Sequence, residues 1–210
     1  QEAAKYGKAN KIASSEDKTF SYIPDCSDLP ISEDADYVYI CENNTIYGTK
    51  FKTLPNTKGK TLVADVSSCF LSEPMDVEKY GMIYGGAQKN VGPAGVTFVI
   101  VRKDLLGKVE RPIQTMVDYR THYTEEVKNR SMFNTPPVLP IFVMHETLKW
   151  VKEQGGLEAM YKINKEKAEL LYNEIDRNPL FVGTAAKEDR SLMNVCFVMA
   201  PGHEALQDEF

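Results

Sequence analysis

The sequence lacks a surplus of positive charge, a long apolar run and a closely spaced pair of cysteines. Its 25 basic residues are outnumbered by 30 acidic ones, and no long run of one sign occurs. Nucleic acid is therefore not expected as a partner, because neutralising phosphates needs an excess of cations. The longest strongly apolar run, residues 96–101, is far shorter than the ~20 residues that span a bilayer, which excludes membrane insertion.

Cysteine is scarce as well, and none of the four cysteines stands in a C-x-x-C pair or beside a histidine at metal-ligand spacing: Cys26, Cys41, Cys69 and Cys196. A zinc site is therefore not expected. The absence of a short disulfide framework and of a secretory signal indicates a reducing compartment, and the cytoplasm is the expected location.

Both ends of the chain look incomplete. The sequence begins at Gln1 without an initiator methionine, and its first residues resemble the end of an amphipathic helix. Residues 204–210 resemble a helix that has barely begun. We therefore expect an interior segment of a larger protein.

Short apolar runs alternate with turn residues and helical periods, which is typical of an α/β protein. Strands are predicted over residues 11–15, 37–40, 61–66, 82–84 and 96–102. Most of these runs are nearly continuous in apolar character, which indicates strands buried on both faces of a sheet. The expected fold is a central, mostly parallel sheet flanked by helices.

The pattern changes to helical spacing after Pro136 and Pro137. One helix is predicted over residues 141–151 and a second over residues 157–175. Trp150 ends the apolar face of the first helix and is predicted to be a core residue. Two further strands are predicted over 181–182 and 192–199. We therefore expect a large domain over residues 1–136 and the start of a smaller α/β domain over residues 137–210.

Lys89 lies in a glycine-rich turn between two apolar strands. A lysine at the end of a buried strand, among residues with little or no side chain, can be approached closely by a flat ligand. Partial burial lowers the pKa of such an amine toward the nucleophilic range, which suits Schiff-base chemistry. The alternative is an ordinary surface lysine in a solvated turn.

Two other strand ends carry polar groups. Asp65 closes a buried strand, and Thr45 follows the strand at 37–40 together with Asn43 and Asn44. Ligands of open α/β sheets gather beyond the carboxyl ends of strands. An amine, a carboxylate and a hydroxyl at three such ends are what pyridoxal phosphate requires. The alternatives are a turn-closing role for Asp65 and a simple turn for the asparagines.

The motifs around these residues also resemble a known family. The stretch from Tyr80 to Lys89, followed by Gly95-Val96-Thr97-Phe98-Val99, resembles the pyridoxal-phosphate attachment signature of class V aminotransferases. Within that class, the segments 85–95, 64–68, 134–137 and 191–195 are similar to those of the phosphoserine aminotransferase family. The resemblance implies a fold type I large domain.

The resemblance also implies roles for three residues. Lys89 would form the Schiff base with the cofactor and then carry a proton between the substrate and the cofactor. Asp65 would keep the pyridine nitrogen protonated. Thr45 would contact the cofactor near its phenolic oxygen.

Three further residues would bind phosphate, according to the same resemblance. Gln88 would bind the phosphate of the cofactor in its own subunit. Asn134 and Thr135 would reach the cofactor of a neighbouring subunit, which implies a homodimer with shared sites.

The reaction implied by the resemblance exchanges an amino group between glutamate and 3-phosphohydroxypyruvate, giving 2-oxoglutarate and O-phospho-L-serine. A related substrate would serve pyridoxine synthesis. Such anions call for cationic side chains. Four candidates follow the lysine, although each reads more simply as a surface or loop residue: Arg111, Arg120, His122 and Arg130. The ring-stacking aromatic and the main substrate ligands of the family are expected outside this chain.

Other functions stay open at this stage. One alternative is another class V enzyme, either a serine–glyoxylate aminotransferase or a cysteine desulfurase. The desulfurase is less compatible with the sequence, because that group has histidine where Gln88 stands and because no cysteine here lies in a flexible Gly/Ser loop. A second alternative is a non-catalytic fragment that keeps the fold but binds no cofactor.

Overall fold

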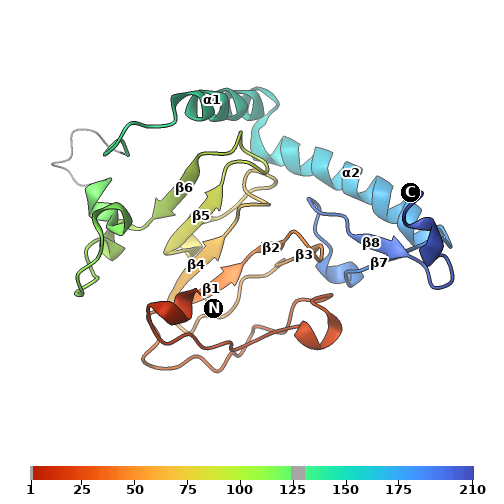
Figure 1. Ribbon diagram of the computed structural model, residues 1–210, viewed down its shortest axis with the longest axis horizontal. Helices are drawn as coiled ribbons and strands as arrows, with labels where there is room; N and C mark the ends of the chain where they lie inside the picture. Colours follow the sequence, from red (N-terminus) through yellow and green to blue (C-terminus); the bar gives the residue numbers. More distant parts are fainter. Residues whose placement is uncertain (1, 124–130) are drawn as a thin grey trace.

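The computed structural model describes residues 2–123 and 131–210. Its centre is a four-stranded sheet in the order β1-β4-β5-β6 (Figure 1), formed by β1 Tyr37–Cys41, β4 Thr61–Asp65, β5 Met82–Gly86 and β6 Thr97–Val101. The first three strands are parallel, and β6 runs antiparallel to β5. The predicted α/β fold with a central, mostly parallel sheet is confirmed.

The sheet buries one face more fully than the other. Val38, Ile40, Leu62 and Ile83 lie in the core on one face, with exposures of 8% or less. Side chains point to alternate faces along a strand, and on the opposite face Tyr39 is 50% exposed. The prediction of burial on both faces is therefore wrong for this face in the described residues, because no layer there covers the tyrosine.

The prediction of a strand over residues 11–15 is wrong, because this segment has no regular secondary structure. Ser14 accepts a hydrogen bond from the backbone N–H of Glu16, and Lys11 pairs with the Glu16 carboxylate at 2.6 Å. Local side-chain bonds of this kind compete with strand pairing.

Short 3₁₀ turns occur next to this segment and elsewhere in the described residues: η1 Ala3–Lys5, η2 Glu16–Lys18, η3 Val77–Lys79, η4 Lys103–Leu105, η5 Thr115–Val117, η6 Tyr119–Thr121, η7 Lys187–Asp189 and η8 Glu204–Leu206.

A short hairpin follows β1. It consists of β2 Asn43–Asn44 and the antiparallel β3 Thr49–Lys50. Gly48 precedes β3 with a φ of +73°, and a Cβ there would meet the carbonyl oxygen of Asn194 at 2.8 Å. Only glycine combines this backbone conformation with such a close approach. The hairpin lies between the sheet and the C-terminal strands (Figure 1).

The C-terminal part contains α1 Val138–Glu153, α2 Gly156–Arg177 and the antiparallel pair β7 Phe181–Gly183 and β8 Phe197–Met199. Both helices were expected from their spacing. Trp150, however, is 50% exposed, so its predicted core position is wrong. Apolar spacing selects a face of a helix, but only a packing partner buries it.

Helix α2 packs on the C-terminal strands and supplies a second cluster of buried residues. Ala168, Tyr172 and Ile175 form this cluster, with Phe181 and Phe197 packed against it. The phenol of Tyr172 donates a 2.8 Å hydrogen bond to the carbonyl of Ser191, which satisfies its hydroxyl inside the cluster. The sheet and the C-terminal part thus each have their own apolar core.

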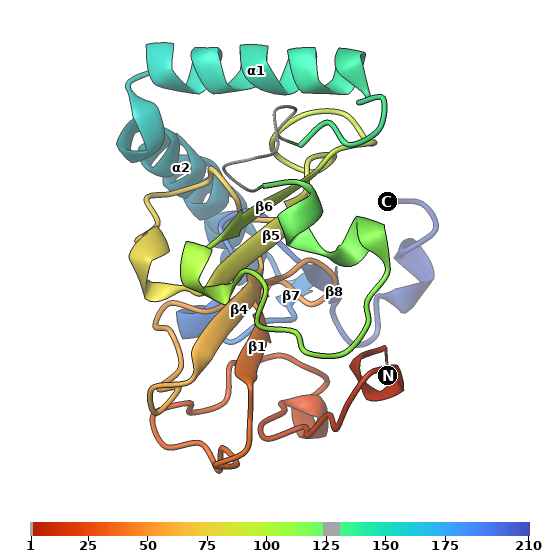
Figure 2. The ribbon, with the colours of Figure 1, turned by 90° about the vertical axis from the view of Figure 1, so that its left-hand side faces the viewer.

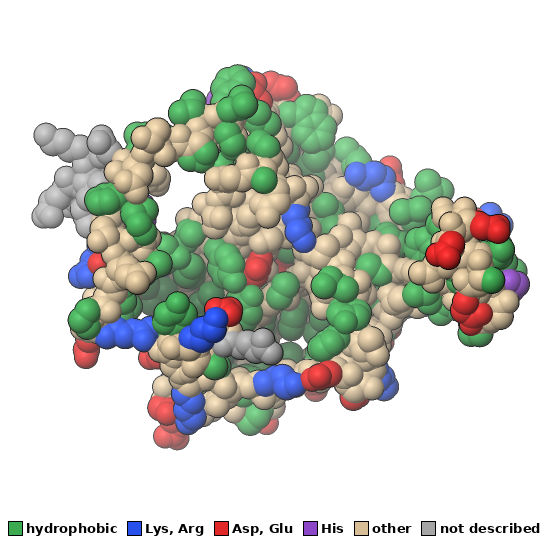
Figure 3. All heavy atoms as spheres, viewed as in Figure 1, with side chains coloured by type: hydrophobic (Ala, Val, Ile, Leu, Met, Phe, Trp, Pro, Cys, Tyr) green, Lys and Arg blue, Asp and Glu red, His purple; other side chains and the backbone are tan. Residues whose placement is uncertain are grey.

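Charged side chains of both signs are interspersed along the lower edge of the view in Figure 3, whereas apolar side chains gather over the strands and α1. Within residues 2–123 and 131–210, no helix is long and apolar enough to cross a membrane.

Candidate active site

The strand ends at 45, 65 and 89 meet at one edge of the sheet. Asp65 is the last residue of β4, and its register partners are Cys41 in β1 and Tyr84 in β5. Lys89 follows β5 by three residues, and its amine donates a 2.9 Å hydrogen bond to the hydroxyl of Thr45. The structure therefore brings together the three strand ends from which the sequence predicts a site.

The turn that carries Lys89 is firmly anchored. The carbonyl of Ala87 accepts hydrogen bonds from the N–H groups of Val91 at 3.1 Å and Gly92 at 2.8 Å. Ala87 and Val91 are fully buried, whereas Lys89 is exposed. The turn thus holds its apolar residues in the core and presents the lysine amine at the surface, so it is more than a freely solvated loop.

Helix α1 lies beyond this end of β5 and β6 (Figure 2). It comes close to the turn at Gly92, where a Cβ would meet the Cα of Met144 at 3.4 Å. At the start of the turn, a Cβ on Gly86 would overlap the amide of Gln88, because that side chain folds back over Gly86. Gly92 therefore brings the turn into van der Waals reach of α1, whereas the overlap at Gly86 involves only the end of a flexible side chain.

The Asp65 carboxylate is oriented by Ser67. Its Oδ1 atom accepts hydrogen bonds from the Ser67 backbone N–H at 2.9 Å and from the Ser67 hydroxyl at 2.6 Å. The same hydroxyl accepts a 3.1 Å hydrogen bond from the N–H of Gly86. Ser67 thereby ties the carboxylate to the strand that leads into the lysine turn. Sequence reasoning missed this residue, although an Asp followed two positions later by Ser is a turn signal.

Two tyrosines stand beside Asp65 on the same face of the sheet. The hydroxyl of Tyr84 donates to that of Tyr39 at 3.2 Å. Burial raises the pKa of both phenols, and the negative charge of Asp65 adds to the rise. Both phenols therefore stay protonated near neutral pH and can act as donors beside the carboxylate. Sequence reasoning missed this pair as well, because both residues read as ordinary strand positions.

The electrostatic effect of the site extends to Cys41. Burial raises the pKa of its thiol, Asp65 raises it further, and the Lys89 ammonium partly offsets these effects. The charges of Asp65 and Lys89 thus act on the same thiol, although the two residues lie at the ends of different strands. The thiol itself stays protonated near neutral pH.

Asn134 and Thr135 lie apart from this cluster in the chain. Both are exposed just before α1, and the Asn134 amide contacts the sulfur of Met116 at 3.3 Å. Within the described ranges, no hydrogen bond joins either residue to Lys89 or Asp65. The single chain therefore does not bring these two residues into the strand-end cluster.

The cationic candidates are engaged elsewhere. Arg111 donates to the carbonyl of Tyr6 at 2.7 Å, and Arg120 forms a bidentate pair with Asp118. The Nε2 atom of His122 lies 3.2 Å from the carbonyl of Met116. Arg130 lies outside the described residues. The described candidates thus act as surface or loop residues in this chain.

Known proteins match the chain in both sequence and fold. The phosphoserine aminotransferase of Parabacteroides distasonis is 54% identical over 210 residues, which are 100% of this chain and 57% of that protein. The structure of phosphoserine aminotransferase from Bacillus circulans subsp. alkalophilus matches with a TM-score of 0.91 at 40% identity, over 99% of this chain and 56% of that one. A phosphoserine aminotransferase from Trichomonas vaginalis with bound pyridoxal phosphate matches with a TM-score of 0.74 at 45% identity, over 84% of this chain and 48% of that one.

The chain spans little more than half the length of these relatives. Residues 2–207 match the family described as aminotransferase class-V. Because this match covers nearly the whole chain, the chain belongs to the class-V aminotransferase family.

Proposed function

We propose that this chain is the central part of a phosphoserine aminotransferase. The enzyme would transfer an amino group between L-glutamate and 3-phosphohydroxypyruvate, giving 2-oxoglutarate and O-phospho-L-serine in serine biosynthesis. The observation that carries the proposal is the hydrogen bond between Lys89 and Thr45 at the strand end beside Asp65. The 54% identity to a phosphoserine aminotransferase supports the choice of substrate.

The residues present fit pyridoxal phosphate as the cofactor. An exposed amine, a hydroxyl and a fixed carboxylate share one sheet edge, and glycines leave the backbone of the turn open to a flat ring. When bound, the cofactor supplies an aldehyde for Schiff-base formation and a ring that accepts electrons. Lys89, Asp65, Thr45 and Gln88 of this chain would hold it.

We infer a task for each of these side chains that is compatible with its contacts. The Lys89 amine is the group that takes up and delivers a proton, and the Thr45 hydroxyl keeps it oriented by accepting its hydrogen bond. Asp65, held in place by Ser67, would stabilise a positive charge on the ring nitrogen of the cofactor. Gln88, exposed above Gly86, offers an amide donor to a phosphate.

The remaining site residues belong to a proposed homodimer. Asn134 and Thr135 are exposed just before α1 and would bind the phosphate of the cofactor in a second subunit. We also propose a domain boundary between residues 136 and 137, which is compatible with the separate apolar cores formed by residues before and after this point. We place the enzyme in the cytoplasm and propose that it also acts on the phosphohydroxythreonine-type substrate of pyridoxine synthesis.

The cofactor proposal is tested by trapping. Addition of pyridoxal phosphate to the complete protein should produce the visible absorbance of a Schiff base, and borohydride reduction followed by peptide mapping should place the adduct on Lys89. Lys89→Ala should abolish the adduct, whereas the exposed Lys79→Ala should leave it unchanged. An adduct on another lysine, or none, refutes the proposal.

A second experiment tests the substrate. Phosphohydroxypyruvate and glyoxylate compete as amino acceptors from glutamate with the complete protein, and phosphohydroxypyruvate should be preferred. A preference for glyoxylate would move the enzyme to another branch of the class-V family.

A further inference from the structure

The hairpin that carries Thr45 is held from both sides. On one side, the hairpin continues from β1, whose last residue, Cys41, pairs with Asp65 of β4. On the other side, the carbonyl of Gly48 accepts a 2.8 Å hydrogen bond from the N–H of Ser191, and the carbonyl of Tyr47 accepts one from the Thr184 hydroxyl at 3.3 Å. The segment beside Lys89 is therefore shared between the sheet and the C-terminal part.

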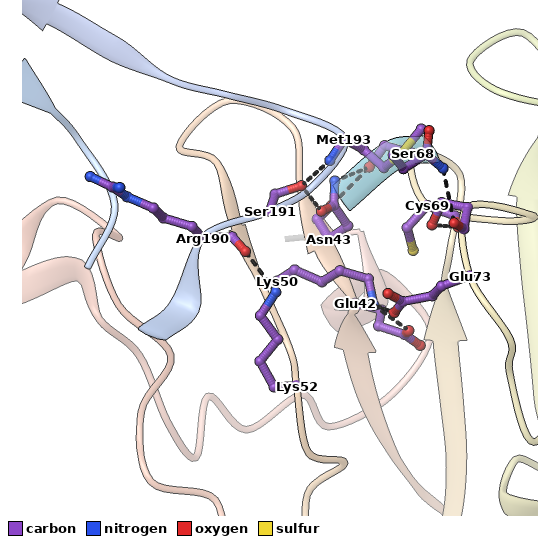
Figure 4. A network of polar contacts seen from close by, with 12 residues as sticks. Glu42, Asn43, Lys50, Lys52, Ser68, Cys69, Glu73, Arg190, Ser191 and Met193 are labelled. Atoms are coloured by element: carbon purple, nitrogen blue, oxygen red, sulfur yellow. Dashed lines mark hydrogen bonds and ion pairs between the residues drawn. The ribbon is translucent and has the colours of Figure 1, made fainter. Parts of the chain in front are cut away.

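Asn43 lies at the centre of this junction (Figure 4). Only 2% of the residue is exposed, and its side-chain amide donates 2.7 Å hydrogen bonds to the Ser68 hydroxyl and to Oδ1 of Asn194. Its Oδ1 atom accepts a 2.5 Å hydrogen bond from the Ser191 hydroxyl. The amide thus uses its donor group and its acceptor on three residues from two segments, Ser68 after β4 and Ser191 and Asn194 of the C-terminal part.

The same residue is linked to both charged groups of the site. The backbone carbonyl of Asn43 accepts a 3.0 Å hydrogen bond from Ser68, which follows Asp65 by three positions. Thr45, which receives the Lys89 hydrogen bond, follows Asn43 by two positions. Displacement of Asn43 would therefore move Thr45 relative to both Asp65 and Lys89.

Packing alone does not explain this choice of residue. A buried polar group gains little net stability over a well-packed apolar one, whereas a fully bonded amide fixes one geometry. Aspartate would direct an oxygen at Oδ1 of Asn194, and alanine would leave the Ser191 and Asn194 groups without their partner. The asparagine specifies the position of the hairpin, and the hairpin specifies the position of the Thr45 hydroxyl.

We propose that Asn43 is a positioning residue, through which Ser191 and Asn194 of the C-terminal part control the reactivity of the Lys89 amine. It acts through Thr45 and does not touch the reacting atoms. The catalytic meaning of this control rests on the proposed function, but the effect on the amine does not require the cofactor.

The test measures the amine directly. In the complete protein, freed of cofactor with hydroxylamine, lysines are labelled with acetic anhydride over a range of pH, and mass spectrometry gives the rate at Lys89 relative to the exposed Lys162. Thr45→Val, which removes the accepting hydroxyl, should raise this ratio about threefold, as expected for loss of one hydrogen bond. Asn43→Ala should raise it in the same direction.

Two further variants make the test specific. Ser191→Ala removes the hydroxyl that donates to Asn43 and accepts from the N–H groups of Met193 and Asn194. Because Asn43 keeps its bonds to Ser68 and Asn194 in this variant, the ratio should rise less than in Asn43→Ala. Ser191→Ala carries the test if Asn43→Ala does not fold. Asn164→Ala is the matched control, because this buried asparagine donates a 2.9 Å hydrogen bond to the Ser72 carbonyl. It should lower the melting temperature and leave the Lys89 ratio unchanged.

The proposal is overturned if neither junction variant changes the ratio, if Asn164→Ala changes it equally, or if Thr45→Val has no effect. Failure of the proposed function would be recognised separately, as the absence of a borohydride-trapped adduct on Lys89 in the unmodified protein.

Discussion

The Lys89 amine and the Thr45 hydroxyl, 44 residues apart in the chain, are joined by a hydrogen bond of 2.9 Å. The amine is exposed, yet its direction is set by a hairpin that packs against the C-terminal part. The candidate site is therefore assembled from the turn after β5, the end of β4 and this hairpin.

Asp65→Asn should lower the rate of amino transfer by about 100-fold or more, because a neutral amide cannot stabilise a positive charge on the cofactor ring. Ser67→Ala should cause a smaller loss, because it removes the hydroxyl hydrogen bond to the carboxylate and keeps the one from the backbone N–H. Stopped-flow absorbance of the glutamate half-reaction measures both. Asp76→Asn, at an exposed carboxylate, is the control and should have no effect; a change of less than twofold for Asp65→Asn would contradict the assigned role.

Gly48→Ala should destabilise the protein more than Gly59→Ala. Both glycines have positive φ, which costs a Cβ-bearing residue about 1 kcal/mol. A Cβ at Gly48 would also collide with the carbonyl of Asn194 and the side chain of Cys196, whereas none of the described atoms lies within 4 Å of the corresponding position at Gly59. We expect a further loss of about 2 kcal/mol at Gly48, measured by urea unfolding. Equal losses would show that the hairpin adapts.

Lys50→Met should lower the free energy of unfolding by about 3 kcal/mol, because it leaves the buried carboxylate of Glu42 and the partly buried carboxylate of Glu73 without their cation. Lys50 is 3% exposed and pairs with Glu73 and with Glu42, the latter at 3.5 Å, while Glu42 also accepts a 2.8 Å hydrogen bond from Tyr80. Burial would lower the pKa of the ammonium, but the carboxylates raise it overall. Adding Glu42→Gln should restore part of the loss, since it removes one unpaired charge. No restoration would mean that packing rather than charge sets the cost.

Acid should weaken the C-terminal part through Asp176. Arg190 and Lys187 hold the pKa of this carboxyl well below its usual value, with contacts of 2.7 and 2.9 Å. A lowered pKa in the folded state gives stability that is present above the pKa of the unfolded state, about 3.9. This stability is lost as the pH falls through that region toward the folded-state pKa.

The pH dependence of unfolding checks this expectation. Asp176→Asn should cost about 1 kcal/mol at neutral pH, and the difference from the unmodified protein should shrink below roughly pH 4. Asp104→Asn, at a more exposed carboxylate that pairs with Arg102, should change the curve less. A difference for Asp176→Asn that stays constant from pH 7 to pH 3 would contradict the pairing.

Much of the fold and part of the site could be predicted from local sequence. The runs at 37–40, 61–66 and 82–84 are apolar and β-rich, so strands form there, and parallel pairing brings their carboxyl ends to one edge. That is why the sequence could predict that Lys89 and Asp65 lie at the same edge of the sheet.

The remaining features depend on contacts that the local pattern does not contain. The half-exposed Trp150 shows that apolar spacing cannot reveal whether a partner covers a helix. For the same reason, the apolar run at 37–40 could not reveal that the face of the sheet with Tyr39 is exposed. Ser67 and Asn43 act through hydrogen bonds whose partners come from other segments, so their importance is visible only in three dimensions.

The Asn43 junction also has a consequence for the order of folding. Asn43 and Ser191 are separated by 148 residues, and such a distant contact closes late because the loss of chain entropy must be met first. During synthesis, the sheet can form while the C-terminal segment is still inside the ribosome, but the hairpin cannot reach its final place. A nascent chain would thus acquire the core of its sheet before it acquires a correctly placed lysine contact, and competence to take up the cofactor would follow formation of the sheet.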